Sequence, residues 1–279
     1  MKKVIYYFSG TGNSMRAAYR IAAALTDTEI VSMRCAPSEV PATDAEVIGF
    51  VFPVYGWTMP ETAVRFIKGL SLNPGAYIFA ISTPAFINGH SFEVLDGILK
   101  EKGASLAYGK ILHSVGNAVT AYSPMPFSKL RVPETEKKLK AISADIVGMK
   151  TRKYPRASAL IRMLYPSMMP KFLSFLHEAD KGFVVTDQCV ACGTCARVCP
   201  CKNIGMEDGK PSFRHQCNFC MSCVAYCPVK AINYAASPEL KETQSDFLFK
   251  NAKLTRKRKR YHNPYVSASD ISADRKHIK

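Results

Sequence analysis

Residues 189–200 read Cys-Val-Ala-Cys-Gly-Thr-Cys-Ala-Arg-Val-Cys-Pro, and residues 217–228 read Cys-Asn-Phe-Cys-Met-Ser-Cys-Val-Ala-Tyr-Cys-Pro. Each stretch places cysteines two, two and three residues apart and ends in proline, and the second repeats the first after 28 residues. Nine of the ten cysteines lie between Cys189 and Cys227, and only Cys35 lies elsewhere. Because no secretory signal opens the sequence, this concentration indicates metal binding rather than a disulfide scaffold.

The spacing of these cysteines is typical of bacterial ferredoxins that hold two [4Fe-4S] clusters. Three thiolates on a tight loop reach three corners of one cubane, and the fourth, beside a proline that ends the loop, points to the other cluster. The predicted ligands of cluster I are Cys189, Cys192, Cys195 and Cys227, and those of cluster II are Cys217, Cys220, Cys223 and Cys199. The alternative is a zinc module, which needs two Cys-x2-Cys pairs for each four-ligand site.

Smaller features complete this region. Cys201 follows Pro200 without a counterpart in the second stretch, where Val229 stands. It is either a spare thiol or a substitute ligand. Residues 206–213 are predicted to form a hairpin with Asp-Gly at its turn, flanked by strands 183–185 and 232–234. So short a region has little apolar core, and its fold should depend on the metal.

The first 150 residues alternate apolar stretches of strand length with helical patterns. The strands are uniformly apolar, which indicates burial on both faces and predicts an open parallel sheet covered by helices. The expected strands are 4–8, 30–32, 47–52, 77–82 and 106–113, and the expected helices are 13–25, 61–70, 92–102 and 134–150. Ligands of such sheets lie at the carboxyl ends of the strands.

The first strand runs into Ser9-Gly10-Thr11-Gly12-Asn13-Ser14 and then directly into a helix. This loop could bind a phosphate, because it offers two glycines, the free N–H groups of a helix start and three hydroxyls. The loop has no lysine, which excludes a P-loop, and Met15 stands where a dinucleotide fingerprint has its third glycine. A glycine turn that binds nothing is the alternative.

This loop resembles the phosphate loop of flavodoxins, and Pro53-Val54-Tyr55-Gly56-Trp57 resembles the loop whose aromatic residue stacks on their flavin ring. The resemblance implies a five-stranded sheet of order 2-1-3-4-5 that binds FMN. The residues that it assigns to FMN are Ser9, Gly10, Thr11, Gly12, Asn13, Ser14, Pro53, Tyr55, Gly56 and Trp57. The alternative for Tyr55 and Trp57 is packing on their own domain. Residues 82–90 depart from the family because they lack its Gly-x-Gly-Asp pattern.

As a whole, the chain resembles the flavodoxin/ferredoxin fusion proteins of anaerobes. The resemblance implies a flavodoxin-like doubly wound α/β domain followed by a small α+β two-cluster ferredoxin-like domain. The predicted boundaries are 1–150 for the FMN-binding domain, 151–180 for a basic, partly helical linker, 181–236 for the ferredoxin domain and 237–279 for a basic tail. Pro166 and Pro170 are expected to divide the linker into two short helices.

The formal net charge is +16, with 38 basic and 22 acidic residues. Residues 151–185 carry 6 basic and 2 acidic side chains and residues 237–279 carry 11 and 5, so most of the excess lies in the linker and the tail. Residues 256–260 are a continuous basic block. This distribution favours an acidic redox partner or peripheral contact with an anionic membrane, and no nucleic-acid partner is expected.

Three functions follow. The leading hypothesis is a cytoplasmic electron carrier that relays electrons among two [4Fe-4S] clusters, FMN and external redox proteins. The second is a flavin-dependent reductase fed by its clusters, although the sequence indicates no catalytic residue. The third is a ferredoxin with a flavodoxin-like docking domain that binds no flavin.

Overall fold

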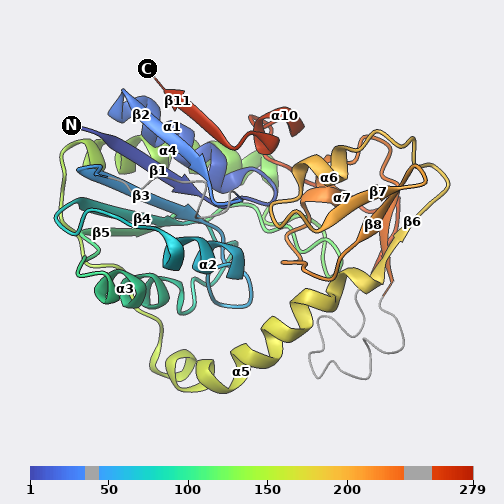
Figure 1. Cartoon of the computed structure of the whole chain (residues 1–279), viewed down its shortest axis with the longest axis horizontal. Coiled ribbons are helices and arrows are strands. Elements are labelled where there is room, and N and C mark those ends of the chain that lie inside the picture. The colour runs from blue at the N-terminus through green and yellow to red at the C-terminus, as the bar shows by residue number, and fades with distance from the viewer. Residues whose placement is uncertain (35–43, 236–252, 279) are drawn as a thin grey trace.

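A six-stranded sheet organises the amino-terminal part of the computed structural model, which describes residues 1–34, 44–235 and 253–278 (Figure 1). The order is β11-β2-β1-β3-β4-β5. The strands are β1 (Lys3–Tyr7), β2 (Thr28–Ser32), β3 (Val47–Phe52), β4 (Tyr77–Ser82), β5 (Tyr108–Ile111) and β11 (Arg275–Ile278). The first five strands pair in parallel in the expected order 2-1-3-4-5, which confirms the flavodoxin-like α/β fold. Cys35 lies outside the described residues.

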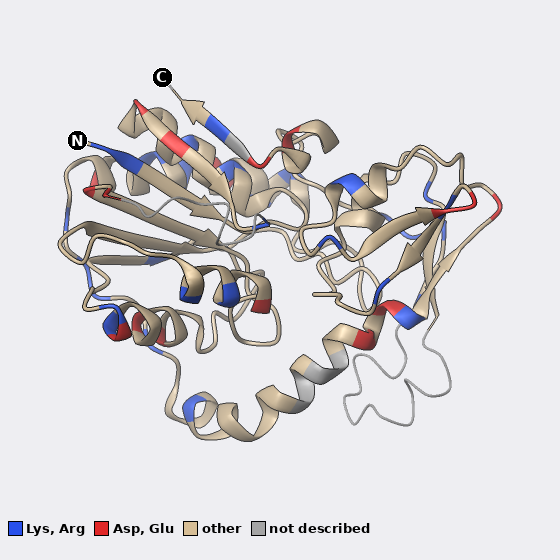
Figure 2. Cartoon of the chain, in the orientation of Figure 1, with Lys and Arg blue, Asp and Glu red and all other residues tan. Residues whose placement is uncertain are grey.

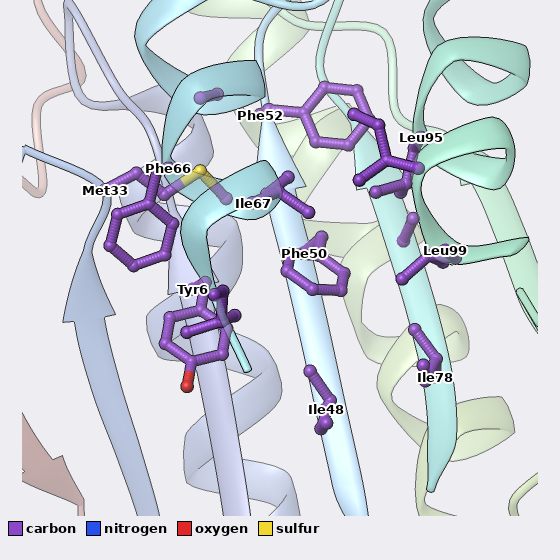
Figure 3. Packing of buried hydrophobic residues seen from close by; sticks show 14 of the residues in the cluster. Tyr6, Met33, Ile48, Phe50, Phe52, Phe66, Ile67, Ile78, Leu95 and Leu99 are labelled. Atoms are coloured by element: carbon purple, nitrogen blue, oxygen red, sulfur yellow. The ribbon is translucent and has the colours of Figure 1, made fainter. Parts of the chain in front are cut away.

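Helices cover both faces of this sheet. One face carries α2 (Glu61–Gly69) and α3 (Ser91–Glu101), and the other carries α1 (Asn13–Leu25) and α4 (Ser128–Val147). Figure 3 shows Phe50 between the sheet and Ile67 of α2, with Leu99 of α3 beside it. Along β1, Tyr6 packs on this face and Ile5 on the other, so both faces of the strand are buried, as its uniform apolar sequence predicts.

The sixth strand comes from the carboxyl-terminal segment, which the sequence predicts only as a basic tail. After α10 (Ala268–Ser272), β11 pairs antiparallel with β2 at the sheet edge, where Arg275 lies opposite Val31. Ile271 of α10 is buried in the core beneath α1. A short, charged strand is typical of a sheet edge. Its sequence is polar, so it lacks the apolar pattern from which strands are predicted.

The second unit shows the 28-residue repeat in its backbone. The helices α6 (Thr194–Val198) and α7 (Ser222–Tyr226) are related by this offset, as are β7 (Ile204–Glu207) and β9 (Ile232–Ala235). β7 pairs with β8 (Lys210–Phe213) as the predicted hairpin, and β9 lies between β6 (Phe183–Val185) and β10 (Lys253–Leu254). Asp208 and Gly209 both have positive φ at the hairpin turn, as a two-residue turn requires.

The linker contains one long helix, so the prediction that Pro166 and Pro170 divide it into two short helices is wrong. The helix α5 runs from Ala159 to Glu178 with both prolines inside it and leads through a 3-10 turn (Ala179–Gly182) into β6 (Figure 1). Each proline leaves one carbonyl without its helical donor, that of Arg162 and that of Pro166. Arg162, Pro166 and Pro170 are all exposed on one side of the helix, where water can bond these carbonyls. None of the helices in the described ranges is both long and apolar enough to cross a membrane.

The two units share a core. Val198 of α6 and Tyr226 of α7 are buried in the same cluster as Met15 and Ala18 of α1, together with Val266 of the carboxyl-terminal segment. Because buried apolar surface is continuous across the junction, the iron–sulfur region and the sheet are held as one body rather than as units on a loose tether.

Candidate cofactor sites

Five cysteine side chains line one cavity of about 330 Å³ in the second unit. They are Cys199, Cys201, Cys217, Cys220 and Cys223. Four of these are the predicted ligands of cluster II, so Cys199 lies with the thiols of the other stretch, as the crossed pattern requires. Burial is the main cause that raises the pKa of Cys223, and the neighbouring Cys220, Cys217 and Cys199 raise it further.

The other predicted ligand group shows the same crossing. Burial raises the pKa of Cys195, and the nearby sulfurs of Cys227 and Cys189 add to the rise. Cys227 therefore lies near Cys189 and Cys195 of the first stretch. This group is closer to the surface, because Cys192 is exposed and the Val190 side chain is 61% exposed.

Backbone geometry prepares both loops for negatively charged sulfur. Asn203 donates its N–H to Cys199 Sγ at 3.3 Å, and Ala231, its counterpart in the repeat, donates to Cys227 Sγ at 3.2 Å. Positive φ values recur at matching positions, as at Ala191 and Phe219. Consecutive backbone N–H groups in such conformations form concave anion sites, which suits thiolates that share a cluster.

A buried aspartate that the sequence did not indicate orients one of these loops. Asp180 accepts hydrogen bonds from Asn203 Nδ2 at 2.7 Å and from the N–H of His215 at 3.1 Å, and it also contacts His215 Nδ1. Its side chain is fully buried. Since Asn203 in turn donates to Cys199, Asp180 holds the residues that position this ligand.

Cys201 is the fifth thiol of the cluster II cavity. Its thiol donates a hydrogen bond to the sulfur of Cys199, and this bond is the main cause that lowers the pKa of Cys199. Its Sγ also lies 3.5 Å from Thr62 Oγ1 at the start of α2. The thiol therefore stands between the cysteine loops and the sheet domain, a position that spacing alone did not reveal.

A second cavity, of about 600 Å³, opens at the carboxyl ends of β1, β3 and β4. Of the residues that the sequence assigns to FMN, it is lined by Ser9, Gly10, Thr11, Asn13, Ser14, Pro53 and Tyr55. Gly12, Gly56 and Trp57 do not line it. Gly12 instead faces Asn263, Val266 and Tyr226, where an added Cβ would come within 3.0 Å of each. The carboxyl-terminal segment thus covers the outer side of the loop.

Polar groups in this cavity suit FMN. Ser9 Oγ accepts from the N–H of Gly12 at 3.1 Å, and within the described residues the N–H groups of Thr11, Asn13 and Ser14 have no acceptor. They lie at the start of the 13-residue helix α1, where the helix dipole favours an anion. These observations fit a phosphate at the loop.

The Asn13 side chain is already engaged within the protein. Its Nδ2 donates to the carbonyl of Val115, and its Oδ1 accepts from the hydroxyl of Tyr261 at 2.8 Å. The backbone N–H of Asn13 is therefore the group that remains for a phosphate. Its side chain instead secures the carboxyl-terminal segment to the loop.

The loop after β5 supplies a wall that the sequence did not predict. Val115, Gly116, Asn117, Ala118 and Tyr122 all line the cavity. Within the described residues, neither polar atom of the buried Asn117 amide has a hydrogen-bond partner. An amide offers both a donor and an acceptor, which match the mixed polar edge of a flavin ring. No recognised motif marks this loop, so only its position after the fifth strand could have indicated it.

The two cavities share a wall. Cys220 and Met221 line both the cysteine cavity and the cavity at the carboxyl ends of the strands. An added Cβ on Gly10 would lie 2.4 Å from the carbonyl oxygen of Cys220. Deep enclosure of the Tyr55 hydroxyl raises its pKa, and Cys220 is the strongest of the nearby charges that raise it further. Two predicted cofactor sites are therefore in direct contact.

Comparison with known proteins supports this division. Residues 181–242 match the family described as 4Fe-4S dicluster domain, which confirms [4Fe-4S] binding as the property of this region. The chain thus combines a flavodoxin-like domain with a ferredoxin-like one, as the resemblance to fusion proteins implies. No curated protein matches the chain.

Several solved structures are similar to the amino-terminal part. Flavodoxin of Megasphaera elsdenii is 22% identical over 39% of this chain and 83% of its own, with a TM-score of 0.33. A flavodoxin from the domain Archaea is 19% identical over 53% and 99%, with a TM-score of 0.33. A short-chain flavodoxin associated with a PDU bacterial microcompartment is 15% identical over 54% and 99%, with a TM-score of 0.38.

Arg260, the last residue of the basic block, anchors the carboxyl-terminal segment to the cysteine unit. It donates to the carbonyls of Val224, Lys230 and Ile232, at 3.1, 3.1 and 2.8 Å. We expect Arg260→Met to destabilise the protein by about 2 kcal/mol, because two part-buried carbonyls and one exposed carbonyl lose a charged donor. Thermal unfolding of the anaerobic protein measures this. Lys259→Met is the matched control, since Lys259 is exposed, and an equal effect would contradict the role of Arg260.

Proposed function

We propose that this chain is an electron-transfer protein that holds two [4Fe-4S] clusters and FMN and exchanges electrons with separate redox proteins. One observation carries the proposal: the loop with Cys217 and Cys220 forms a wall of the cavity that the phosphate loop also lines. When bound, the clusters would supply one-electron chemistry and FMN one- or two-electron chemistry. Electron transfer between cofactors depends on proximity, which this shared wall provides.

The residues of the chain have distinct tasks in this proposal. Cys199, Cys217, Cys220 and Cys223 would hold the cluster beside the flavin cavity. Cys189, Cys192, Cys195 and Cys227 would hold the cluster nearer the surface. The exposed turn at Val190 and Cys192 is the part of the cysteine region that a partner protein can approach. The loop 9–14 would bind the FMN phosphate, Tyr55 would contact the ring, and Asn117 would bind its polar edge.

Composition of the anaerobically prepared protein tests the proposal. We expect about eight iron, eight sulfide and one flavin per chain after supply of FMN. Full iron content without flavin would instead support a ferredoxin whose flavodoxin-like domain serves only for docking. Zinc in place of iron would overturn both cluster assignments. Rapid exchange with reduced ferredoxin-type proteins, without turnover of small acceptors, distinguishes the carrier from a reductase.

A reductase is the second candidate because of the surface beside the cavity. Phe86 and Ile87 follow the cavity residue Ala85 and are 51% and 52% exposed. The Phe86 ring lies 6.5 Å from that of Tyr122, which lines the cavity. Apolar side chains at this position suit a small apolar acceptor such as a quinone. Steady turnover of such a compound by the loaded protein would support this function over the carrier.

Tyr55 gives a test of the flavin cavity by itself. We expect Tyr55→Leu to weaken FMN binding about tenfold, because the ring contact is lost while the phosphate loop is retained. Fluorescence titration of the flavin-free protein with FMN measures the change. Trp57→Leu is the control, since Trp57 belongs to the same loop but does not line the cavity. If Trp57→Leu has the larger effect, Trp57 rather than Tyr55 contacts the ring.

A further inference from the structure

The helix α5 carries an apolar stripe that is partly exposed in the described part of the structure. Leu160, Met163, Leu164 and Met168 are 61%, 70%, 37% and 41% exposed. Their spacing of three, one and four residues places them on one side of an α-helix. The opposite side is used to attach the helix to the protein, so the stripe faces outward.

The attachment of α5 is specific. The hydroxyl of Tyr165 lies 2.8 Å from Thr58 Oγ1, and its ring lies 4.5 Å from that of His90. Met169, one turn further along, is buried, and Ser158 caps the first turn by accepting from the N–H of Ile161. These contacts hold the helix in one orientation and leave the stripe of Leu160, Met163, Leu164 and Met168 free of them.

The chain segment that contains this helix carries charge of a single sign. No acidic residue occurs between Asp145 and Glu178. The same interval has six basic residues, Lys150, Arg152, Lys153, Arg156, Arg162 and Lys171. Arg152, Lys153, Arg156 and Arg162 are all exposed. In Figure 2 the turn near the start of α5 is blue, and acidic colour appears only at its far end.

We propose that α5 docks the protein on an anionic lipid surface. Exposed Leu and Met side chains would enter the boundary between headgroups and acyl chains, while the arginines remain among the headgroups. Basic residues near an anionic membrane add to the attraction, so the absence of acidic residues from this segment of the sequence matters as much as the number of arginines. An apolar stripe beside a segment that carries only basic charge is the pattern of a helix that lies on an anionic membrane, which favours lipid over a protein partner.

Vesicle binding by the complete, anaerobically prepared chain tests the proposal. We expect it to sediment with vesicles of equal parts phosphatidylglycerol and phosphatidylcholine, and to bind vesicles of phosphatidylcholine alone at least about tenfold more weakly. The double variant Leu160→Gln/Met163→Gln should weaken binding about tenfold. The variant Arg156→Gln/Arg162→Gln should weaken it by roughly tenfold or more and reduce its dependence on salt.

A matched control lies elsewhere on the surface. Phe127 and Leu130 are 77% and 72% exposed, so Phe127→Gln/Leu130→Gln removes as much exposed apolar surface without changing α5. This control should bind vesicles like the wild type. All variants should keep the visible absorbance of the wild-type protein. Equal loss in the control, or no preference for anionic vesicles, overturns the proposal. A wild-type dimer that Leu160→Gln/Met163→Gln converts to a monomer would instead show that a second copy covers the stripe.

Discussion

Replacing Cys199 by serine should remove the cluster held by Cys217, Cys220 and Cys223 and leave the other cluster in place. We expect iron to fall from about eight to about four atoms per chain, because a cubane that loses a thiolate ligand at a buried site is not retained. The reason is spatial: Cys199 lies in the cavity of the second stretch although it belongs to the first. Iron analysis and the EPR spectrum of the reduced protein measure the loss.

Three further variants make the result decisive. The spectrum of Cys199→Ser should match that of Cys217→Ser and differ from that of Cys189→Ser. Cys201→Ser is the control for a nearby thiol, and it should keep both clusters, since the four crossed ligands remain. Loss of iron in Cys201→Ser together with retention in Cys199→Ser would make Cys201 the true ligand. A match between Cys199→Ser and Cys189→Ser would falsify the crossing.

A single methyl group at Gly10 should separate the two cofactor sites. In Gly10→Ala the new Cβ would lie 2.4 Å from the carbonyl oxygen of Cys220 and 2.8 Å from the Tyr55 hydroxyl. Both are held by packed structure, so the loops must move apart, at a cost of about 1–3 kcal/mol. We expect lower thermal stability and FMN binding weakened at least about tenfold, measured by thermal unfolding and by fluorescence titration.

Gly97→Ala is the control for this substitution. Gly97 lies inside α3, and an added Cβ there has no atom within 4 Å. Because alanine favours a helix, Gly97→Ala should be stabilising by about 0.5–1 kcal/mol and leave FMN binding unchanged. Wild-type stability and flavin affinity in Gly10→Ala would show that the phosphate loop and the Cys220 loop are not in contact in solution.

Prediction from sequence succeeded where local pattern decides structure. The parallel sheet, the hairpin at Asp208 and Gly209 and the repeat of cysteine loops follow from residues close in the chain, and all are observed. Proline predicts a break in a helix, yet α5 is continuous through Pro166 and Pro170. Whether a proline interrupts a helix depends on which side of the helix faces water, and that depends on tertiary packing.

Part of the candidate site was also beyond sequence analysis. The phosphate loop and Tyr55 were identified from residues 9–14 and 53–57, but Asn117 and Tyr122 carry no motif. The sequence predicts the segment from Arg260 to Val266 as part of a basic, polar tail. In the structure, Asn263 donates its N–H to the carbonyl of Thr11 at 2.7 Å and covers the phosphate loop. Such contacts join residues about 250 positions apart, where spacing in the sequence contains no information about neighbours.

The sequence by itself determined the spacing of the thiols that would bind iron and the composition of the loop that would bind a phosphate, because ligand type and spacing within a turn set that chemistry. Only the tertiary structure decided that the two sites meet. Gly10 and Cys220 come into contact because Val198 and Tyr226 share a core with α1. That burial joins the cysteine unit to the sheet, and it depends on side chains from three distant parts of the chain packing together.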